Sequence, residues 1–250
     1  MAEVTFLEAI REGLKEEMEH DDRVFLIGED IGAYGGAFKI TEGLYDLFGP
    51  QRVIDTPIAE AAVIGAAAGA AMNGMRPVAE LQFIDFISCG GFDALVTVAA
   101  KSRYRNGMGC PLVVRGPCGA GGRGGPFHSA CPEMWALTTP GIKVVFPSTP
   151  YDAKGLLKAA IRDPDPVLFL EHKYLYRRLK EDLPEDDYIV PLGQAIERHP
   201  GDDLVILSYG AMVHKSMEAA ITLSKEGFGV RVIDLRSLLP LDETMILESV

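Results

Sequence analysis

Apolar residues recur every four positions near the start of the chain, a spacing that predicts a helix with one buried face. These residues are Phe6, Ile10, Leu14 and Met18. Thr5, followed three positions later by Glu8, has the pattern of a capping box that begins a helix. We therefore expect the chain to open with an amphipathic helix.

Short, continuously apolar segments then alternate with helical segments. The predicted strands are 24–28, 52–54, 77–83, 111–116, 142–147 and 167–171, and the predicted helices are 41–48, 60–73, 93–104 and 152–162. Strands without a polar alternation are buried on both faces, which is typical of a parallel sheet covered by helices. We expect an α/β fold with a doubly wound parallel sheet.

The pattern lapses between 173 and 191, where the chain is charged and contains prolines, as linkers do. A second α/β unit follows, with strands predicted over 204–210 and 230–235. We expect a first domain over 1–180, a linker over 181–191 and a smaller domain over 192–250. Since two strands cannot close such a sheet, the smaller domain is expected to be incomplete.

Composition excludes several partners. The net charge of −12, from 24 basic and 36 acidic residues, would repel nucleic acid. The small-residue run 61–72 is too short to span a membrane. The acidic N-terminus resembles neither a secretory signal nor a transit peptide, so we expect a cytoplasmic protein, or a mitochondrial matrix protein already trimmed of a presequence. The four cysteines contain no Cys-x-x-Cys pair and are expected to be free thiols.

Candidate chemistry follows the ends of strands, where ligands bind in parallel sheets. Glu29 follows the first strand, Glu60 opens the small-residue helix, and His128 closes a glycine-rich loop. The string 119–124 in that loop fits a dinucleotide motif, but no helix follows it. We therefore interpret the loop as a mobile active-site loop, in which His128 is either a proton carrier or an idle solvated residue.

The position of Glu60 in the sequence allows two interpretations. A carboxylate in the first turn of a helix commonly stabilises the helix dipole. The stripe Gly65, Gly69 and Asn73, however, would let another helix approach closely, which predicts a subunit interface and a buried Glu60. Nearby, Phe83 and Phe86 flank Asp85, and such aromatic residues form either core or a stacking surface for a planar ring.

Long motifs add a family resemblance. The segments RVIDTPIAEAAVIGAAAGAAMNGMRPVAELQF, FHSACPE and VIDLRSLLPLDE closely resemble the β subunit of the thiamine-diphosphate-dependent E1 component of 2-oxo acid dehydrogenase complexes. The likeness covers essentially the whole chain. It is greatest to the branched-chain form, which the segment PSTPYDAKGLL…EHKYLYR resembles most. It implies a transketolase-like pyrimidine-binding domain followed by the start of a transketolase C-terminal-like domain. Pyruvate and acetoin dehydrogenase β subunits are the alternatives.

The resemblance implies roles for the candidate residues. Glu60 matches the glutamate that bonds the aminopyrimidine of the cofactor, and His128 matches the histidine that faces the reacting centre. The other cofactor-binding positions implied are Glu29, Ile58, Gln82 and Phe86. A potassium site that steadies the glycine loop is implied at Leu112, Ala160, Ile161, Asp163 and Asp165, the last being commonly Asn in the family.

The sequence has no Gly-Asp-Gly, the motif that holds the cofactor's diphosphate and Mg²⁺. The resemblance therefore implies a separate E1 α chain, an α2β2 heterotetramer, and acyl transfer to the lipoyl group of the E2 acyltransferase. A transketolase-like enzyme would carry the diphosphate module on the same chain. A non-catalytic scaffold is the remaining alternative, although Glu60, Phe86 and His128 are all present.

Overall fold

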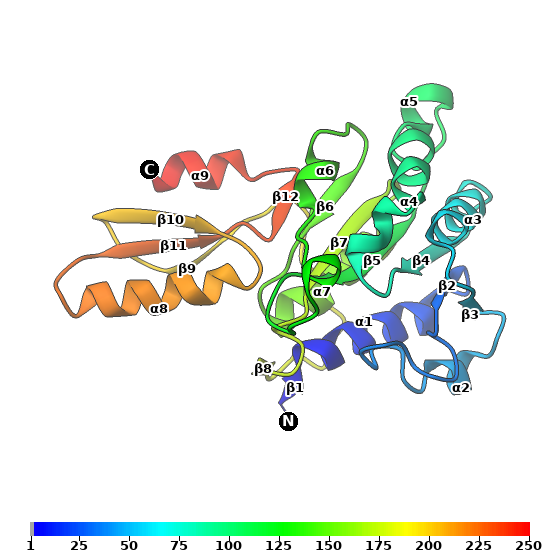
Figure 1. The fold of residues 1–250 in the computed structure, drawn as a ribbon. Helices are drawn as coiled ribbons and strands as arrows, with labels where there is room; N and C mark the ends of the chain where they lie inside the picture. The colour runs from blue at the N-terminus through cyan, green and yellow to red at the C-terminus, as the bar shows by residue number, and fades with distance from the viewer. Residues whose placement is uncertain (1–2) are drawn as a thin grey trace.

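A computed structural model describes residues 3–250 and is built on a seven-stranded sheet of order β12-β6-β7-β5-β4-β2-β3 (Figure 1). Its strands are β2 (Val24–Glu29), β3 (Val53–Thr56), β4 (Arg76–Glu80), β5 (Val113–Cys118), β6 (Lys143–Val145), β7 (Val167–His172) and β12 (Ser237–Leu239). All neighbours are parallel except β12 and β6. The predicted parallel α/β sheet is confirmed.

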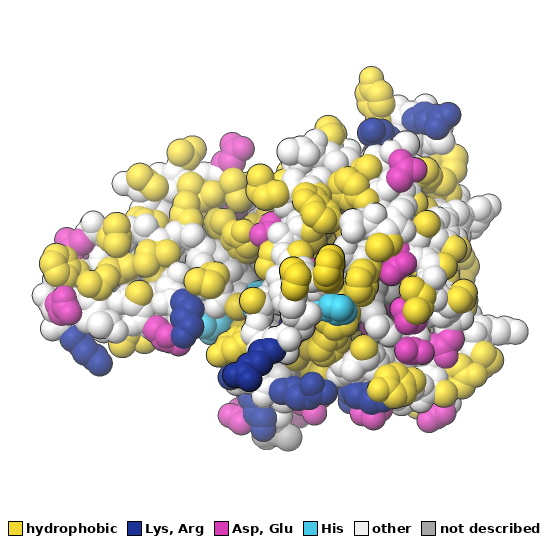
Figure 2. Space-filling model, viewed as in Figure 1, with side chains coloured by type: hydrophobic (Ala, Val, Ile, Leu, Met, Phe, Trp, Pro, Cys, Tyr) yellow, Lys and Arg dark blue, Asp and Glu magenta, His cyan; other side chains and the backbone are white. Residues whose placement is uncertain are grey.

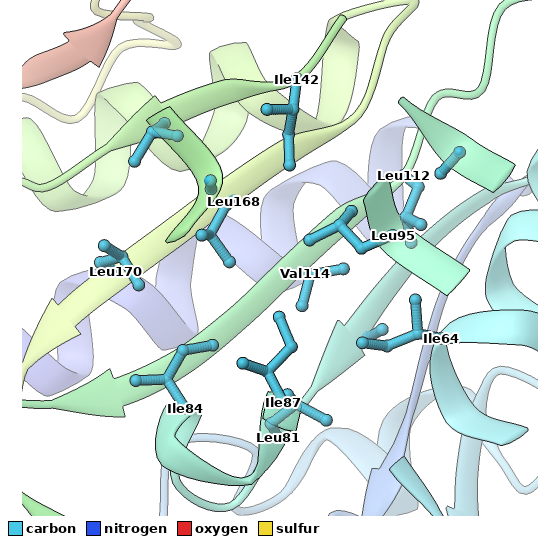
Figure 3. Close-up of a cluster of buried hydrophobic side chains, with 14 of the residues drawn as sticks. Ile64, Leu81, Ile84, Ile87, Leu95, Leu112, Val114, Ile142, Leu168 and Leu170 are labelled. Carbon is cyan, nitrogen blue, oxygen red and sulfur yellow. The ribbon is translucent and has the colours of Figure 1, made fainter. Parts of the chain in front are cut away.

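Helices cover both faces of this sheet, as a doubly wound fold requires. Helices α1 (Phe6–His20) and α7 (Pro150–Arg162) pack on one face, where Leu26 and Val113 are buried. Helix α3 (Glu60–Met72) covers the other face. There, Ile64 lies with Val114 and Leu168 in one apolar cluster (Figure 3). The capping box of Thr5 and Glu8 is present at the start of α1.

Shorter helices complete the first unit. They are α2 (Leu44–Phe48), η1 (Ile84–Ser88), α4 (Gly91–Asp93), η2 (Ala94–Ala99), α5 (Ser102–Asn106), η3 (Pro126–His128) and α6 (Glu133–Leu137). The helix predicted over 93–104 is interrupted, because η2 is π-helical.

The C-terminal unit has more strands than the pattern predicts. Strands β10 (Leu204–Ser208), β11 (Val230–Asp234) and β9 (Ile196–His199) form a three-stranded sheet, with α8 (Met212–Ser224) and α9 (Glu243–Ser249) beside it (Figure 1). The same part of the chain also supplies β12 to the main sheet. Arg236 Nη1 donates to Asp152 Oδ1 at 3.0 Å, a buried ion pair that joins this unit to α7.

The segment predicted as a linker packs on the first unit. Strand β8 (Lys180–Glu181) pairs with β1 (Val4–Thr5), and Val190 N donates to Gly155 O at 3.0 Å. Val190 is buried. The exact domain boundaries stay a prediction. Across residues 3–250, no helix has the length and apolar character needed to cross a membrane.

Candidate functional site

The candidate cofactor residues lie at the carboxyl ends of β2, β3 and β4. These strands are neighbours in register, with Gly28 opposite both Asp55 and Glu80. The loop after β2 folds over the end of β3, where Gly32 N donates to Asp55 Oδ1 at 2.6 Å. A Cβ on Gly32 would lie 2.3 Å from Asp55 Oδ2, so only glycine allows this close approach.

Glu60 is the first residue of α3, and its side chain is half-buried. The adjoining Ala61 and Ala62 face outward and are exposed. The expected burial of Glu60 at a subunit interface concerns the assembly and stays a prediction. Glu29 lies close enough to interact with it: burial, followed by the charges of Asp30 and Glu60, raises the pKa of Glu29. Carboxylates thus gather at this edge of the sheet, and their repulsion favours the protonated form of Glu29.

The other implied lining residues surround the same edge. Gln82 Nε2 donates to Asp30 Oδ2 at 3.2 Å, which places Gln82 beside the end of β2. Ile58 is 75% exposed and projects from the turn before α3. An apolar side chain with this much exposed surface is available to contact a ligand or another subunit.

His128 lies against two aromatic rings from the segment that follows β4. Its ring centroid is 4.5 Å from that of Phe83 and 5.3 Å from that of Phe86, both edge to face. Phe86 and His128 are half-buried. The structure therefore brings the predicted stacking residue and the predicted proton carrier together.

Two charged side chains that contact this loop have backbone partners in it. Asp85 Oδ1 accepts from Ser129 N at 3.1 Å and from Ala130 N at 2.8 Å. Lys173 Nζ donates to His128 O at 2.7 Å and also to Gly119 O. From the sequence, Asp85 was considered only as a carboxylate between two aromatic residues that could bond a ring nitrogen, and Lys173 only as part of the charged stretch after β7; neither contact with the loop was predicted.

A buried charge cluster lies across the ends of β4, β5 and β7. Arg115 donates to Glu80 and, through two nitrogens at 2.6 Å each, to Glu171. Tyr176 Oη donates to Glu171 Oε2 at 2.6 Å. Burial raises the pKa of Glu80 in this cluster. The sequence signal was a charged residue inside each of three apolar strands, and it was missed.

All four cysteines are free thiols, as predicted. Cys110 and Cys118 are buried, whereas Cys89 and Cys131 are exposed. Burial raises the pKa of the Cys118 thiol, while a hydrogen bond from Cys118 lowers the pKa of Cys131.

The oxygen atoms implied as potassium ligands lie away from the glycine loop. They precede or end elements at the amino edge of the sheet, whereas the glycine loop follows the carboxyl end of β5. Six residues of β5 separate the two edges, about 20 Å of extended chain. The implied ligands therefore make no direct contact with the glycine loop in this geometry, and the role of the site in steadying that loop stays a prediction.

Those oxygens also have protein partners already. Leu112 O accepts from Val167 N at 2.9 Å and Ala160 O from Asp163 N at 3.3 Å. Arg76 Nη1 donates to Ile161 O at 2.7 Å. Lys143 Nζ pairs with Asp163 at 2.6 Å, and Arg103 Nε with Asp165 at 2.7 Å. Basic side chains thus occupy the positions around these ligands, and the set does not fit a vacant potassium site.

Two cavities lie near these regions. One of about 580 Å³, lined by Tyr104, Pro140 and Asp165 among others, opens at the amino edge of the sheet, away from Glu60. Another of about 180 Å³ adjoins the glycine loop and is lined by Gly121, Lys173 and Arg177 among others. In the described range 3–250, no cluster of three or more His, Cys, Asp or Glu side chains could hold a metal ion.

Comparisons with known proteins agree with this geometry. Residues 2–178 match the family model of the transketolase pyrimidine-binding domain, and residues 193–250 match that of the transketolase C-terminal domain. A solved structure described as a split-gene transketolase, an inactive β4 tetramer, has a TM-score of 0.77 at 24% identity over 99% of this chain and 76% of its own. Leishmania mexicana transketolase has a TM-score of 0.74 at 20% identity, over 95% of this chain and 35% of its own. Both likenesses confirm the transketolase-like fold.

Sequence relatives are closer. The 2-oxoisovalerate dehydrogenase subunit β of Bacillus subtilis is 51% identical over 100% of this chain and 76% of its own length. The pyruvate dehydrogenase E1 subunit β of the same organism is 46% identical over 100% of this chain and 77% of its own. The resemblance stated from the motifs is confirmed: the chain belongs to the family of E1 β subunits of 2-oxo acid dehydrogenases, built on transketolase pyrimidine-binding and C-terminal domains.

Proposed function

We propose that this chain is the β subunit of a thiamine-diphosphate-dependent enzyme that oxidatively decarboxylates a branched-chain 2-oxo acid and passes the acyl group to a lipoyl group on E2. The observation that carries the proposal is the 51% identity to a 2-oxoisovalerate dehydrogenase β subunit, against 46% for the pyruvate relative. Since both matches span the chain, a pyruvate enzyme is the second candidate, and an acetoin enzyme remains the alternative from the sequence motifs.

The residues at the carboxyl edge suit the pyrimidine half of the cofactor. Bound thiamine diphosphate supplies the electron sink for decarboxylation. Glu60 would hold the ring and share a proton with its nitrogen, and the raised pKa of Glu29 beside it favours a retained proton. Phe86 offers an aromatic face, while Ile58 and Gln82 would line the ring's edge.

His128 would act on the far side of the reacting centre. An imidazole ring can accept a proton at one nitrogen and donate one from the other, so it can pass a proton to an incoming group. Its contacts with Phe83 and Phe86 keep one edge of the ring in an apolar setting. We infer that His128 positions the reaction intermediates or donates a proton to the arriving lipoyl group.

The remaining parts would come from other chains. The sequence lacks the Gly-Asp-Gly that binds diphosphate and Mg²⁺, so a partner α chain would hold them in an α2β2 heterotetramer. The half-exposure of Glu60 is consistent with a site completed by that partner. Potassium has no part in the proposal, because its implied ligands are already paired with Arg76, Lys143 and Arg103. A cytoplasmic location stays a prediction.

The test uses the purified chain with its α partner, thiamine diphosphate and Mg²⁺, following CO₂ release from 3-methyl-2-oxobutanoate and from pyruvate. We expect preference for the branched substrate, and a loss of about a thousandfold in kcat for Glu60→Gln because the shared proton is lost. Glu42→Gln, a change at an exposed carboxylate outside the site, is the matched control. Preference for pyruvate would change the substrate class, and a near-wild-type rate for Glu60→Gln would refute the role of Glu60.

A further inference from the structure

The peptide group that joins His128 to Ser129 is held at both of its polar ends. Its oxygen accepts from Lys173 Nζ at 2.7 Å, and its N–H donates to Asp85 Oδ1 at 3.1 Å. A cation thus holds the carbonyl and an anion holds the amide. Hydrogen bonds with one charged partner are about twice as strong as neutral ones.

Each charged side chain also holds a second point of the same loop. Asp85 Oδ1 accepts from Ala130 N at 2.8 Å, and Lys173 Nζ donates to Gly119 O. Gly119 N in turn donates to Ala130 O at 2.9 Å, which closes the base of the loop. The contacts therefore fix both ends of the segment 119–130 as well as the backbone of His128.

The two side chains are attached to regular elements of the fold or directly follow one. Asp85 lies in η1 and is 8% exposed, and Lys173 directly follows β7 of the central sheet. By contrast, Gly121 and Gly125 in the loop adopt positive φ, and 120–127 are exposed. A glycine-rich segment has many accessible conformations, so its histidine needs external contacts to keep one position.

The aromatic partners of His128 come from the same segment as Asp85. Phe83 and Phe86 lie two residues before and one after it, and both contact the His128 ring. Lys173 Nζ also lies 5.8 Å from the centroid of the Phe83 ring. The backbone and the ring of His128 therefore contact one connected group of neighbours.

We propose that Asp85 and Lys173 are positioning residues that fix His128 for its step in the reaction. The inference rests on the proposed function of His128 but adds residues that the family likeness did not supply. A displacement of about 1 Å at a reacting group can cost about a hundredfold in rate. Neither side chain needs to touch the substrate to have this effect.

The kinetic test uses the assembled enzyme carrying Lys173→Met, Lys173→Arg or His128→Ala. We expect Lys173→Met to lower kcat by about tenfold or more while KM for the 2-oxo acid changes by less than about twofold. Arginine keeps the charged donor, so Lys173→Arg should recover most of the rate. In the His128→Ala background, Lys173→Met should add less than about twofold; a full, multiplicative loss there would overturn the proposal.

A second measurement needs no activity. Arg123 is exposed in the loop, so trypsin cleavage after it reports how often the loop leaves its position. We expect cleavage about tenfold faster in Lys173→Met and Asp85→Ala, and a smaller increase in Asp85→Asn, which keeps an acceptor oxygen. Lys225→Met, which removes an exposed lysine after α8, is the matched control and should cleave like the wild type.

The two measurements separate the possible failures. Unchanged cleavage in both Lys173→Met and Asp85→Ala would show that these contacts do not hold the loop and would overturn the inference. If the wild-type assembly released no CO₂ from any 2-oxo acid while cleavage still rose in the variants, the proposed function would fail and the loop restraint would stand.

Discussion

His172 shows how the surroundings of a single residue set its charge. It ends β7, and its ring stacks on Phe146 with centroids 6.3 Å apart. In the described part of the chain its Nδ1 is buried without a hydrogen-bond partner. Burial, followed by the charge of Lys173, lowers the pKa of His172 to about 4. The ring is therefore neutral in the folded protein at pH 7.

This lowered pKa predicts a pH dependence of stability. The unfolded chain takes up a proton near pH 6.5, whereas the folded chain does so only near pH 4, so stability is lost as pH falls from about 6.5 to about 4. Between pH 7 and pH 5 we expect this residue to cost at most about 2 kcal/mol of the free energy of unfolding.

Urea unfolding at the two pH values tests the effect, with His172→Gln as the comparison because glutamine keeps a polar side chain but does not titrate. The variant should lose less stability than the wild type on acidification. Equal losses in both proteins would contradict the assignment.

At this scale the sequence predicted where the candidate residues lie but not the contacts between them. Glu60, Phe86 and His128 stand in motifs with recognisable spacing, so their places at one sheet edge could be predicted. Asp85 and Lys173 bind the backbone of the same loop. They lie far apart in the sequence, so no local pattern predicts these shared contacts. Glu60 is half-buried within this chain, and its expected burial at a subunit interface depends on a partner that the sequence of one chain does not contain.

Among the elements, the approach of α4 to α3 depends on a glycine. A Cβ on Gly91 would lie 2.8 Å from Ile64 Cδ1 and 3.3 Å from Glu60 O, the backbone of the candidate acid. The start of α4 therefore supports the first turn of α3. The π-helical η2 (Ala94–Ala99) follows directly after this contact.

Gly91→Ala should destabilise the chain by about 1–3 kcal/mol, because Ile64 or the first turn of α3 must move. Gly65→Ala on α3 is the matched control: a Cβ there meets no atom within 4 Å, so the higher helix propensity of alanine should stabilise by up to about 1 kcal/mol. Urea unfolding of the full chain measures both. Similar effects of the two substitutions would show that the contact between α3 and α4 is loose.

The predicted elements were those with long apolar or amphipathic patterns. Strands β2, β5 and β7 are buried on both faces, so their continuously apolar sequences were sufficient to predict them. Strand β9, Ile-Glu-Arg-His, carries charged side chains and was missed. Strand β12 was missed because its pairing with β6 depends on the return of the chain from the second unit, which no local pattern specifies.

At the scale of the molecule, α3 has an outward face made of small residues. Ala61, Ala62, Gly65, Ala66 and Gly69 are exposed. Hydrophobic side chains are also spread over the face of the molecule seen in Figure 2, several of them large and well exposed. A smooth, small-residue helix face allows another helix to approach closely. This arrangement supports the proposed assembly with Glu60 at the subunit interface.

Gly69→Leu separates folding from assembly. In the chain alone a Cβ at this position meets no atom within 4 Å, and leucine favours helix more than glycine does, so the melting temperature should stay level or rise. In an assembly with a second helix packed on this face, the larger side chain would prevent close approach, and we expect at least about a tenfold loss of α-partner binding. Ala219→Leu places the same side chain on the exposed surface of α8 and should bind normally. Wild-type binding by Gly69→Leu would show that the outward face of α3 is not the interface, and the completion of the Glu60 site would then have to come from another surface.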